Sequence, residues 1–284
     1  MNTWLIGARP RTLPAAVAPV VVATALAGSD ASLLPALLAL IVSLSLQVGV
    51  NYANDYSDGI RGTDKDRVGP TRITASGLAT PSAVKRAAFT AFGVGAVAGL
   101  GLAVMTSWWL IAVGLAAIFA AWGYTGGKNP YGYLGLGELF VFIFFGVVAT
   151  VGTFYVQTET ITAHALLASI PMGTFACALL AINNIRDRAL DAPAGKKTLA
   201  VRLGDRRARY FFAALIALGY LAAIAIASPW ILLTLLTAPI AISLVRGVLG
   251  TAQGRELIPY LAKTGQLQLL FAVIFSLSLV LSHG

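Results

Sequence analysis

The chain has 284 residues, of which 58% are hydrophobic and only 11% carry a charge. Soluble globular proteins carry roughly 25% charged residues, so this composition excludes a soluble protein and predicts a chain that lies in a lipid bilayer. The formal charge of +9 does not indicate a nucleic-acid partner, because membrane proteins use Lys and Arg to set their topology and to bind anions. No polar linker divides the chain, so we predict one membrane domain over residues 1–284.

Uncharged apolar stretches recur along the chain at the length that crosses a bilayer, about 20 residues. We therefore predict an all-α integral membrane bundle of nine transmembrane helices. They cover residues 12–29, 31–54, 87–127 (two spans that part at Thr106-Ser107), 139–158, 160–185, 210–245 (two spans that part at Ser228-Pro229) and 264–282.

With nine spans, all 20 Lys and Arg residues fall on the same face of the membrane. Cytoplasmic segments are rich in Lys and Arg, so this face is predicted to be cytoplasmic. The N-terminus is then cytoplasmic and the C-terminus outside. An alternative is that the first apolar stretch is a signal peptide.

The pattern Asn-x-x-x-Asp occurs after the second span, at Asn54 and Asp58, and again after the sixth, at Asn183 and Asp187. This repetition predicts two pseudo-repeated four-helix units, at about residues 12–127 and 139–245. The ninth helix, at about 264–282, follows them.

The two Asn/Asp segments are candidate metal sites. At i, i+4 spacing, Asn54 and Asp58 share a helix face, as do Asp187 and Asp191, and Asp55 lies between the first two. Carboxylate and amide oxygens without His or Cys favour a hard cation, most naturally Mg²⁺. The alternative is a set of solvated loops with surface ion pairs.

Basic residues surround these acids, and we expect five of them to bind diphosphate: Arg67, Arg72, Lys128, Lys196 and Lys197. Mg²⁺ with Lys and Arg is the usual way to bind a diphosphate. At the mouth of an apolar bundle, this chemistry indicates a lipid diphosphate. The allylic cation left by its departure needs a dry, aromatic pocket, for which Tyr124 is a candidate; the alternative for this aromatic is an interface belt.

These residues resemble the UbiA superfamily of intramembrane prenyltransferases, in which an N-D-x-x-D motif follows the second of nine helices and a D-x-x-x-D motif the sixth. The resemblance implies a metal or diphosphate role for Asn54, Asp58, Asp187 and Asp191. A Tyr-x-x-x-Lys step, matched by Tyr124 and Lys128, implies an aromatic group near the cation and a lysine on the diphosphate.

The resemblance is closer to one branch, which prenylates 1,4-dihydroxy-2-naphthoate in menaquinone synthesis. Blocks similar to that branch lie at residues 8–20, 51–66, 69–77, 135–157 and 183–205. The implied reaction replaces the carboxyl group of the naphthoate with a polyprenyl chain, and diphosphate and CO₂ leave. The implied location is the plasma membrane of a bacterium, with the active site facing the cytoplasm.

For the acceptor we expect Arg11 to bind the carboxylate, together with Gln47, Asn51 and Asn183. Arg11 could instead only fix topology. Asp64 or Asp66 is the expected acceptor of a ring hydroxyl proton. The alternative function is that of a sibling prenyltransferase that acts on 4-hydroxybenzoate or homogentisate. A transporter is disfavoured, because the middle of each span is almost free of ionisable groups.

Overall fold

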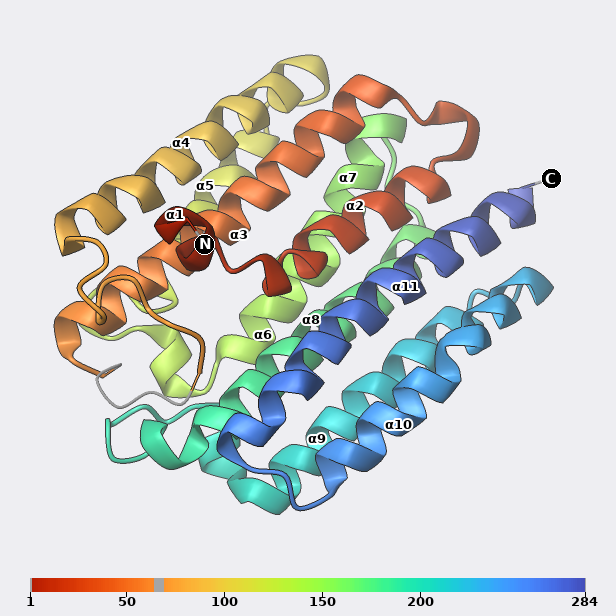
Figure 1. The fold of residues 1–284 in the computed structure, drawn as a ribbon. Coiled ribbons are helices and arrows are strands. Elements are labelled where there is room, and N and C mark those ends of the chain that lie inside the picture. The colour runs from red at the N-terminus through yellow and green to blue at the C-terminus, as the bar shows by residue number, and fades with distance from the viewer. Residues whose placement is uncertain (1, 64–68, 284) are drawn as a thin grey trace.

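The structure, a computed structural model, describes residues 2–63 and 69–283, and every regular element in this part of the chain is a helix (Figure 1). Within these described residues, seven helices are long and apolar enough to cross a membrane. Two shorter apolar helices, Pro14–Leu26 and Leu110–Gly123, accompany them. The prediction of an all-α multi-pass membrane protein is confirmed at this level.

The first half of the chain begins with a short helix that precedes the bundle. Its elements are α1 (Thr3–Ala8), η1 (Pro10–Thr12), α2 (Pro14–Leu26), η2 (Gly28–Asp30), α3 (Leu33–Arg61), α4 (Pro81–Met105) and α5 (Leu110–Gly123). The side chain of Thr80 accepts a hydrogen bond from the backbone N–H of Ala83, and Pro81 is the first residue of α4. Both features are favourable at a helix N-terminus, so α4 begins abruptly there.

The second half of the chain contains one long helix that is α-helical at both ends and π-helical in between. Its elements are η3 (Tyr131–Leu134), α6 (Gly137–Val141), η4 (Phe142–Val148, π-helical), α7 (Ala149–Thr158), α8 (Ala163–Asp191), α9 (Leu199–Ile224), η5 (Pro229–Thr237), α10 (Ala238–Leu249), η6 (Gly254–Leu257) and α11 (Ile258–His283). Elements α6, η4 and α7 run on without a break as one apolar span, Gly137–Thr158.

The predicted internal breaks agree with the structure, whereas the predicted ends of the second and sixth spans are wrong. α4 ends at Met105 and α5 begins at Leu110, and a new element begins at Pro229. However, α3 continues to Arg61 and α8 to Asp191. The acids therefore lie in the last turns of helices and not in loops. Polar residues do not end a helix by themselves; α3 ends where Gly62 adopts the left-handed conformation (φ 70°).

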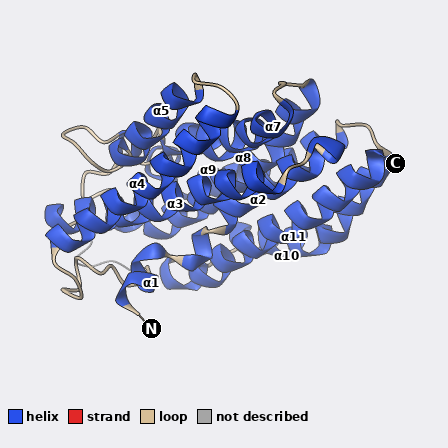
Figure 2. Cartoon of the chain, turned by 90° about the horizontal axis from the view of Figure 1, so that it is seen from above, coloured by secondary structure: helices blue, strands red, loops and turns tan. Residues whose placement is uncertain are grey.

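Helix α8 is the centre of the bundle, since 78% of its apolar segment is buried inside the protein. It packs against α9, while α3 packs against α4 and α11 against α2. On α8, the ring of Phe175 lies 4.7 Å from that of Phe271 on α11, and both side chains are fully buried. Figure 2 shows α5 and α7 on one side of the bundle and α10 and α11 on the opposite side.

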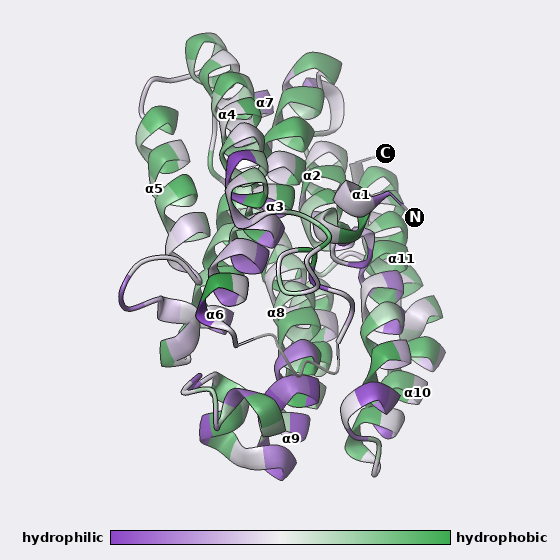
Figure 3. Cartoon of the chain, turned by 60° about the vertical axis from the view of Figure 1, so that its left-hand side comes forward, coloured by the Kyte–Doolittle hydropathy of each residue, from purple (hydrophilic) through white to green (hydrophobic). Residues whose placement is uncertain are grey.

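Both α3 and α8 end at the same end of the bundle, which we call the motif end; α4 and α9 begin there (Figure 1). The opposite end is called the far end. Figure 3 shows that hydrophilic segments gather at the motif end, on α9 and α10 and on the end of α3. The fold therefore brings the two Asn/Asp segments to one end of an apolar bundle.

Candidate functional site

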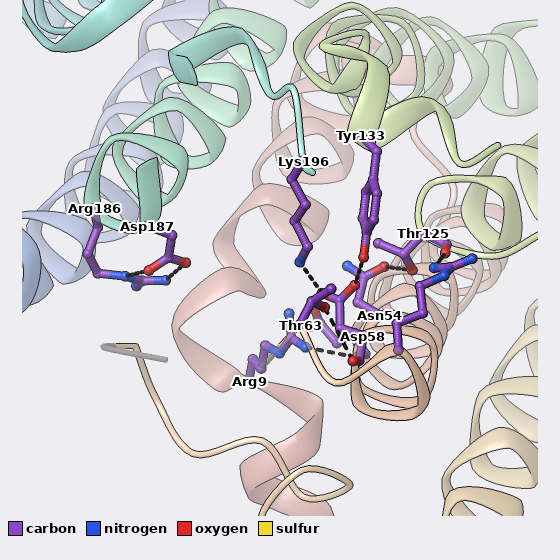
Figure 4. A network of polar contacts seen from close by, with 11 residues as sticks. Arg9, Asn54, Asp58, Thr63, Thr125, Tyr133, Arg186, Asp187 and Lys196 are labelled. Carbon is purple, nitrogen blue, oxygen red and sulfur yellow. Dashed lines mark hydrogen bonds and ion pairs between the residues drawn. The ribbon is translucent and has the colours of Figure 1, made fainter. Parts of the chain in front are cut away.

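Asp58 lies at the centre of the site and contacts residues from distant parts of the chain (Figure 4). The Nζ of Lys196 lies 2.9 Å from its Oδ2, and the hydroxyl of Tyr133 donates a hydrogen bond of 2.6 Å to its Oδ1. Asp58 is only 3% exposed. Because a buried carboxylate is costly unless paired, this double contact fixes the end of α3 against the segments before α6 and α9.

Tyr133 also lies between two cations. The Nζ of Lys196 is 4.9 Å from the centre of its ring, and the guanidinium of Arg61 is 5.4 Å from it. Arg61 donates hydrogen bonds to the backbone carbonyls of Thr125 and Gly127. The turn after α5 is thereby attached to the end of α3. Burial and the neighbouring negative charge of Asp58 raise the pKa of Tyr133, which keeps its hydroxyl a donor.

Asn54 and Asp55 lie one turn before Asp58 and have different surroundings. The Oδ1 of Asn54 accepts a hydrogen bond of 2.8 Å from the hydroxyl of Thr125. Both oxygens of Asp55 accept backbone hydrogen bonds, from Ile73 at 3.1 Å and from Thr74 at 2.9 Å. Asp55 is fully buried, so in this structure it anchors the segment before α4. Its assignment to the metal stays a prediction.

On α8, Asp187 pairs with its neighbour Arg186, whose Nε and Nη2 donate hydrogen bonds of 2.7 and 2.6 Å to the two carboxylate oxygens. Both side chains are buried. Figure 4 shows this pair apart from the group around Asp58. Asp191 is half-buried in the last turn of α8. The two motifs thus lie at one end of the bundle, and each has an acid neutralised by a buried cation.

The residues predicted to bind diphosphate differ in their burial and contacts. Lys196 contacts Asp58, and Arg72 is buried beside the segment that Asp55 anchors. Lys128 and Lys197 are exposed. Arg67 lies outside the described residues, as do the two predicted proton acceptors, Asp64 and Asp66.

The donor set of the two motifs fits a hard divalent cation in its chemistry, because it consists of amide and carboxylate oxygens. Among residues 2–63 and 69–283, no three His, Cys, Asp or Glu side chains converge on one point. Asp58 and Asp187 instead pair with Lys196 and Arg186. The structure therefore supplies carboxylate oxygens whose negative charge is balanced by an ammonium and a guanidinium group.

An apolar cavity with a free volume of about 260 Å³ opens beside the motifs. Its polar end is lined by Arg9, Gln47, Asn51, Asn54 and Asn183. Most of its remaining walls come from apolar side chains and glycines of α2, α3, α4, α5, α6, η4, α7 and α8. An amphipathic molecule would bind here with its polar group at the motif end and its apolar part among the helices.

Three of the predicted acceptor-binding residues, Gln47, Asn51 and Asn183, line this cavity, whereas Arg11 does not. Arg11 is exposed. Arg9, which the sequence analysis missed, lines the cavity and donates a hydrogen bond of 3.0 Å to the backbone carbonyl of Asn51. Its backbone is left-handed (φ 53°), which is uncommon for a residue other than glycine and turns the chain between α1 and η1.

The side-chain amides of Gln47 and Asn51 are hydrogen-bonded to each other and to the segment that precedes α2. The Nε2 of Gln47 donates hydrogen bonds to the hydroxyl of Thr12, at 3.0 Å, and to the Oδ1 of Asn51, at 3.4 Å. Asn51 donates to the carbonyl of Ala8, at 2.9 Å. These bonds fix both amides at the polar end of the cavity.

Tyr124 lines the cavity, and its role as an aromatic group near a cation stays a prediction. Its ring is 5.5 Å from that of Tyr131, which in turn stacks on Phe140 at 4.0 Å. Tyr124, Tyr131 and Phe140 all line the cavity, so they present a group of aromatic rings to it.

Glu138 is a buried acid that the sequence analysis did not single out. It lies in the first turn of α6, at 6% exposure, and its Oε1 accepts a hydrogen bond of 2.9 Å from the amide of Asn184. Its Oε2 has no partner among the described residues. The available signal was a lone carboxylate at the start of a long apolar run, which is rare within membrane spans and is usually functional.

The fold and the site together define a class of protein. The chain belongs to the UbiA prenyltransferase family, whose sequence pattern matches residues 16–257. Among its relatives, 1,4-dihydroxy-2-naphthoate octaprenyltransferase of Mycobacterium tuberculosis is 51% identical over 274 residues, 95% of this chain and 94% of the relative. The protein of the same name from Escherichia coli is 38% identical over 297 residues, 99% of this chain and 96% of the relative.

Solved structures of the family have the same fold. A UbiA homolog from Archaeoglobus fulgidus bound to GPP and Mg²⁺ superposes with a TM-score of 0.67 at 15% identity, over 98% of this chain and 99% of that chain. The apo structure of a UbiA homolog from Aeropyrum pernix K1 gives a TM-score of 0.67 at 15% identity, over 95% and 98% of the two chains. The predicted membership in this family is confirmed.

Proposed function

We propose that this chain transfers a polyprenyl group from a polyprenyl diphosphate to 1,4-dihydroxy-2-naphthoate, with loss of diphosphate and CO₂, to give demethylmenaquinol for menaquinone synthesis. The observation that carries the proposal is the position of Asp58 and Lys196 next to the polar end of an apolar cavity. The names of the relatives at 38% and 51% identity support the choice of acceptor.

The donor binds with its diphosphate at the motif end. Asn54, Asp58, Asp187 and Asp191 would hold Mg²⁺, which when bound neutralises the charge that develops on the leaving diphosphate. The Archaeoglobus fulgidus homolog, which was solved bound to GPP and Mg²⁺, supports this assignment. The ion pairs of Asp58 and Asp187 open as the diphosphate arrives, so that the freed cation Lys196 turns to its oxygens.

Further basic residues complete the diphosphate site in this proposal. They are Arg67, Arg72, Lys128 and Lys197. Exposed lysines reach an incoming anion without having to break a buried contact first.

The allylic carbon of the donor lies next to Tyr124 and Tyr131. When the bond to the diphosphate breaks, the carbon becomes cationic, and aromatic faces attract a cation. The cavity walls exclude water, which would otherwise capture the cation. The electron-rich ring of the acceptor then attacks it.

The naphthoate binds at the polar end of the cavity. We assign its carboxylate to Arg9 rather than Arg11, because Arg9 lines the cavity and Arg11 is exposed. The amides of Gln47, Asn51 and Asn183 would orient its hydroxyl groups. Asp64 or Asp66 accepts the hydroxyl proton in this proposal and returns it to the same oxygen when decarboxylation restores the aromatic ring.

The membrane topology in this proposal has nine crossings, with the seven long helices joined by α2 and by α5. The N-terminus and the motif end face the cytoplasm of a bacterium, and the C-terminus lies outside. The two four-helix units, at about residues 12–127 and 139–245, each contribute one acidic motif. The concentration of Lys and Arg at the motif end supports this orientation.

The test is to incubate the purified full chain with Mg²⁺, a polyprenyl diphosphate and one aromatic acid at a time, and to identify the product by mass. We expect a prenylated naphthoquinol from 1,4-dihydroxy-2-naphthoate and no product from 4-hydroxybenzoate or homogentisate. A product from either of those two acids alone would overturn the assignment of the acceptor.

A further inference from the structure

A second hollow lies on the outer surface of the bundle, apart from the central cavity. It is an open groove between α1, α3 and α4, which we call the outer groove. Trp4 on α1 and Tyr52 on α3 line it on one side, and α4 contributes its other lining residues. None of the residues that line the outer groove lines the central cavity. The proposed reaction therefore leaves this groove without a role.

Helix α4 gives the outer groove an apolar strip with one cation beside it. Ala83, Ala87 and Ala91 follow one another at a spacing of four residues, so they share a helix face over about 12 Å of the helix. Arg86 and Thr90 also line the groove. Arg86 is exposed and makes no hydrogen bond or ion pair with the described residues. Its guanidinium is therefore available to an anion that enters the groove.

The outer groove lies where lipid headgroups meet the acyl chains. Trp and Tyr side chains concentrate at this level of a membrane, and the rings of Trp4 and Tyr52 lie 6.0 Å apart in edge-to-face contact. Arg86 is the last charged residue of α4, which continues to Met105. Phe89, in the next turn, is 49% exposed, so this surface of the helix faces lipid from there on.

We propose that the outer groove binds one anionic phospholipid, with its phosphate on Arg86 and the start of an acyl chain along the three alanines. A guanidinium group suits a phosphate, and basic pockets between transmembrane helices bind anionic headgroups. In the proposed topology the motif end faces the cytoplasm, where the leaflet carries anionic lipids. A zwitterionic lipid fits less well, because its ammonium group offsets the charge of its phosphate.

The bound lipid also stabilises α1 and, through it, the position of Arg9. Helix α1 has only six residues, and so short a helix is not stable by itself. It is held on α3 by the hydroxyl of Tyr52, which donates a hydrogen bond of 2.8 Å to the carbonyl of Trp4. The side chain of Trp4 is still 42% exposed, so a lipid in the groove buries more of it. Because α1 ends at Ala8, directly before Arg9, the lipid favours the backbone that places Arg9 at the cavity. This consequence rests on the proposed function, whereas the lipid site does not.

The test of the lipid site uses the full chain in nanodiscs of phosphatidylcholine with increasing amounts of phosphatidylglycerol. Native mass spectrometry of the released protein counts the phosphatidylglycerol that stays bound, and we expect one on the wild type. Arg86→Gln should weaken its retention about fivefold, as expected for one basic side chain at an anionic surface. Thr90→Trp keeps the charge but fills the groove, and should weaken retention as well. Both residues are exposed, so the variants fold as the wild type does.

The matched control is Arg207→Gln. Arg207 is exposed on α9 and does not line the outer groove, so this variant removes the same charge from the motif end elsewhere. It should retain the lipid as the wild type does. Wild-type retention in both groove variants, or an equal loss in Arg86→Gln and Arg207→Gln, would overturn the lipid site.

A second measurement tests the coupling to Arg9. The apparent KM of the wild type for 1,4-dihydroxy-2-naphthoate should fall as phosphatidylglycerol is added, with kcat unchanged, and should stay constant in Arg86→Gln. A wild-type KM that does not depend on phosphatidylglycerol would overturn this coupling. A chain that retains the lipid but transfers no prenyl group to the naphthoate would instead refute the proposed function and leave the lipid site standing.

Discussion

Lys196 and Asp58 are 138 residues apart in the chain, yet the Nζ of one lies 2.9 Å from the Oδ2 of the other, and both side chains are buried. The pair joins the end of α3 to the segment that precedes α9. An ion pair therefore joins the first half of the chain to the second at the motif end. The same contact holds the carboxylate in place before any substrate arrives.

The first prediction concerns this pair. Asp58→Ala leaves a buried ammonium group without a partner, which typically costs about 3–5 kcal/mol. We expect a clear drop in the unfolding temperature in detergent, with partial recovery in the double variant Asp58→Ala/Lys196→Met. Both variants should be inactive. The control is Asp30→Ala, since Asp30 is exposed at the far end; equal unfolding temperatures in all variants would show that the pair has no structural role.

The second prediction concerns the hydroxyl of Tyr133. Tyr133→Phe keeps the ring beside Lys196 and Arg61 but removes the donor to Asp58. A hydrogen bond to a charged group contributes about 1.5–3 kcal/mol, so the variant should be less stable at neutral pH and should lose part of its activity. Tyr133→Leu, which removes the ring too, should lose more.

The same residue predicts a dependence of stability on pH. Burial raises the pKa of Tyr133 above its ordinary value of 10.0, and the charge of Asp58 adds to this shift. Below about pH 10, the folded and unfolded states both hold the phenol proton, so the stabilising contribution is fully present. As the pH rises further, the unfolded state loses the proton first and stability falls. The unfolding temperature should therefore decline more steeply above pH 10 in the wild type than in Tyr133→Phe; parallel curves would contradict this.

The shared helix faces of the two motifs could be predicted, because spacing alone places Asn54 and Asp58 on one face, and Asp187 and Asp191 on another. Arg9 and Arg11 could not be told apart in this way. Arg9 lines the cavity because its backbone is left-handed. No local sequence pattern predicts that conformation.

The partners of the motif acids were also beyond prediction from sequence. Tyr133 and Lys196 reach Asp58 only after α5, α8 and the segments that follow them have packed together. The ends of the second and sixth spans were predicted too early for a different reason. Hydropathy marks where the apolar part of a helix ends, whereas α3 continues for seven residues beyond Asn54, to Arg61.

The third prediction distinguishes Arg9 from Arg11. Arg9→Gln should raise the apparent KM for the naphthoate about tenfold or more and leave that for the prenyl diphosphate within twofold. Arg11→Gln is the matched control, because its side chain is exposed and does not line the cavity. Steady-state kinetics with each substrate varied in turn measure the effect. The opposite result, a rise with Arg11→Gln alone, would return the carboxylate to Arg11.

The fourth prediction concerns the crossing of η4 and α8. A Cβ at Gly146 would lie 2.6 Å from the Cα of Gly173, and small residues let helix backbones approach closely in membranes. Gly146→Ala should force the helices apart and lower the unfolding temperature by several degrees. Gly93→Ala, in open space, should leave it unchanged. If both variants unfold at the wild-type temperature, the close crossing contributes nothing to stability.

The central claim is that prenyl transfer and decarboxylation of the naphthoate occur together on this chain. The most direct measurement uses 1,4-dihydroxy-2-naphthoate labelled with ¹³C in its carboxyl group, with Mg²⁺ and octaprenyl diphosphate, and follows labelled CO₂ and prenylated product in the same reaction. We predict one labelled CO₂ for each prenylated product, and neither of them with Asp58→Asn. A prenylated product that keeps the label, or equal turnover with Asp58→Asn, would contradict the account.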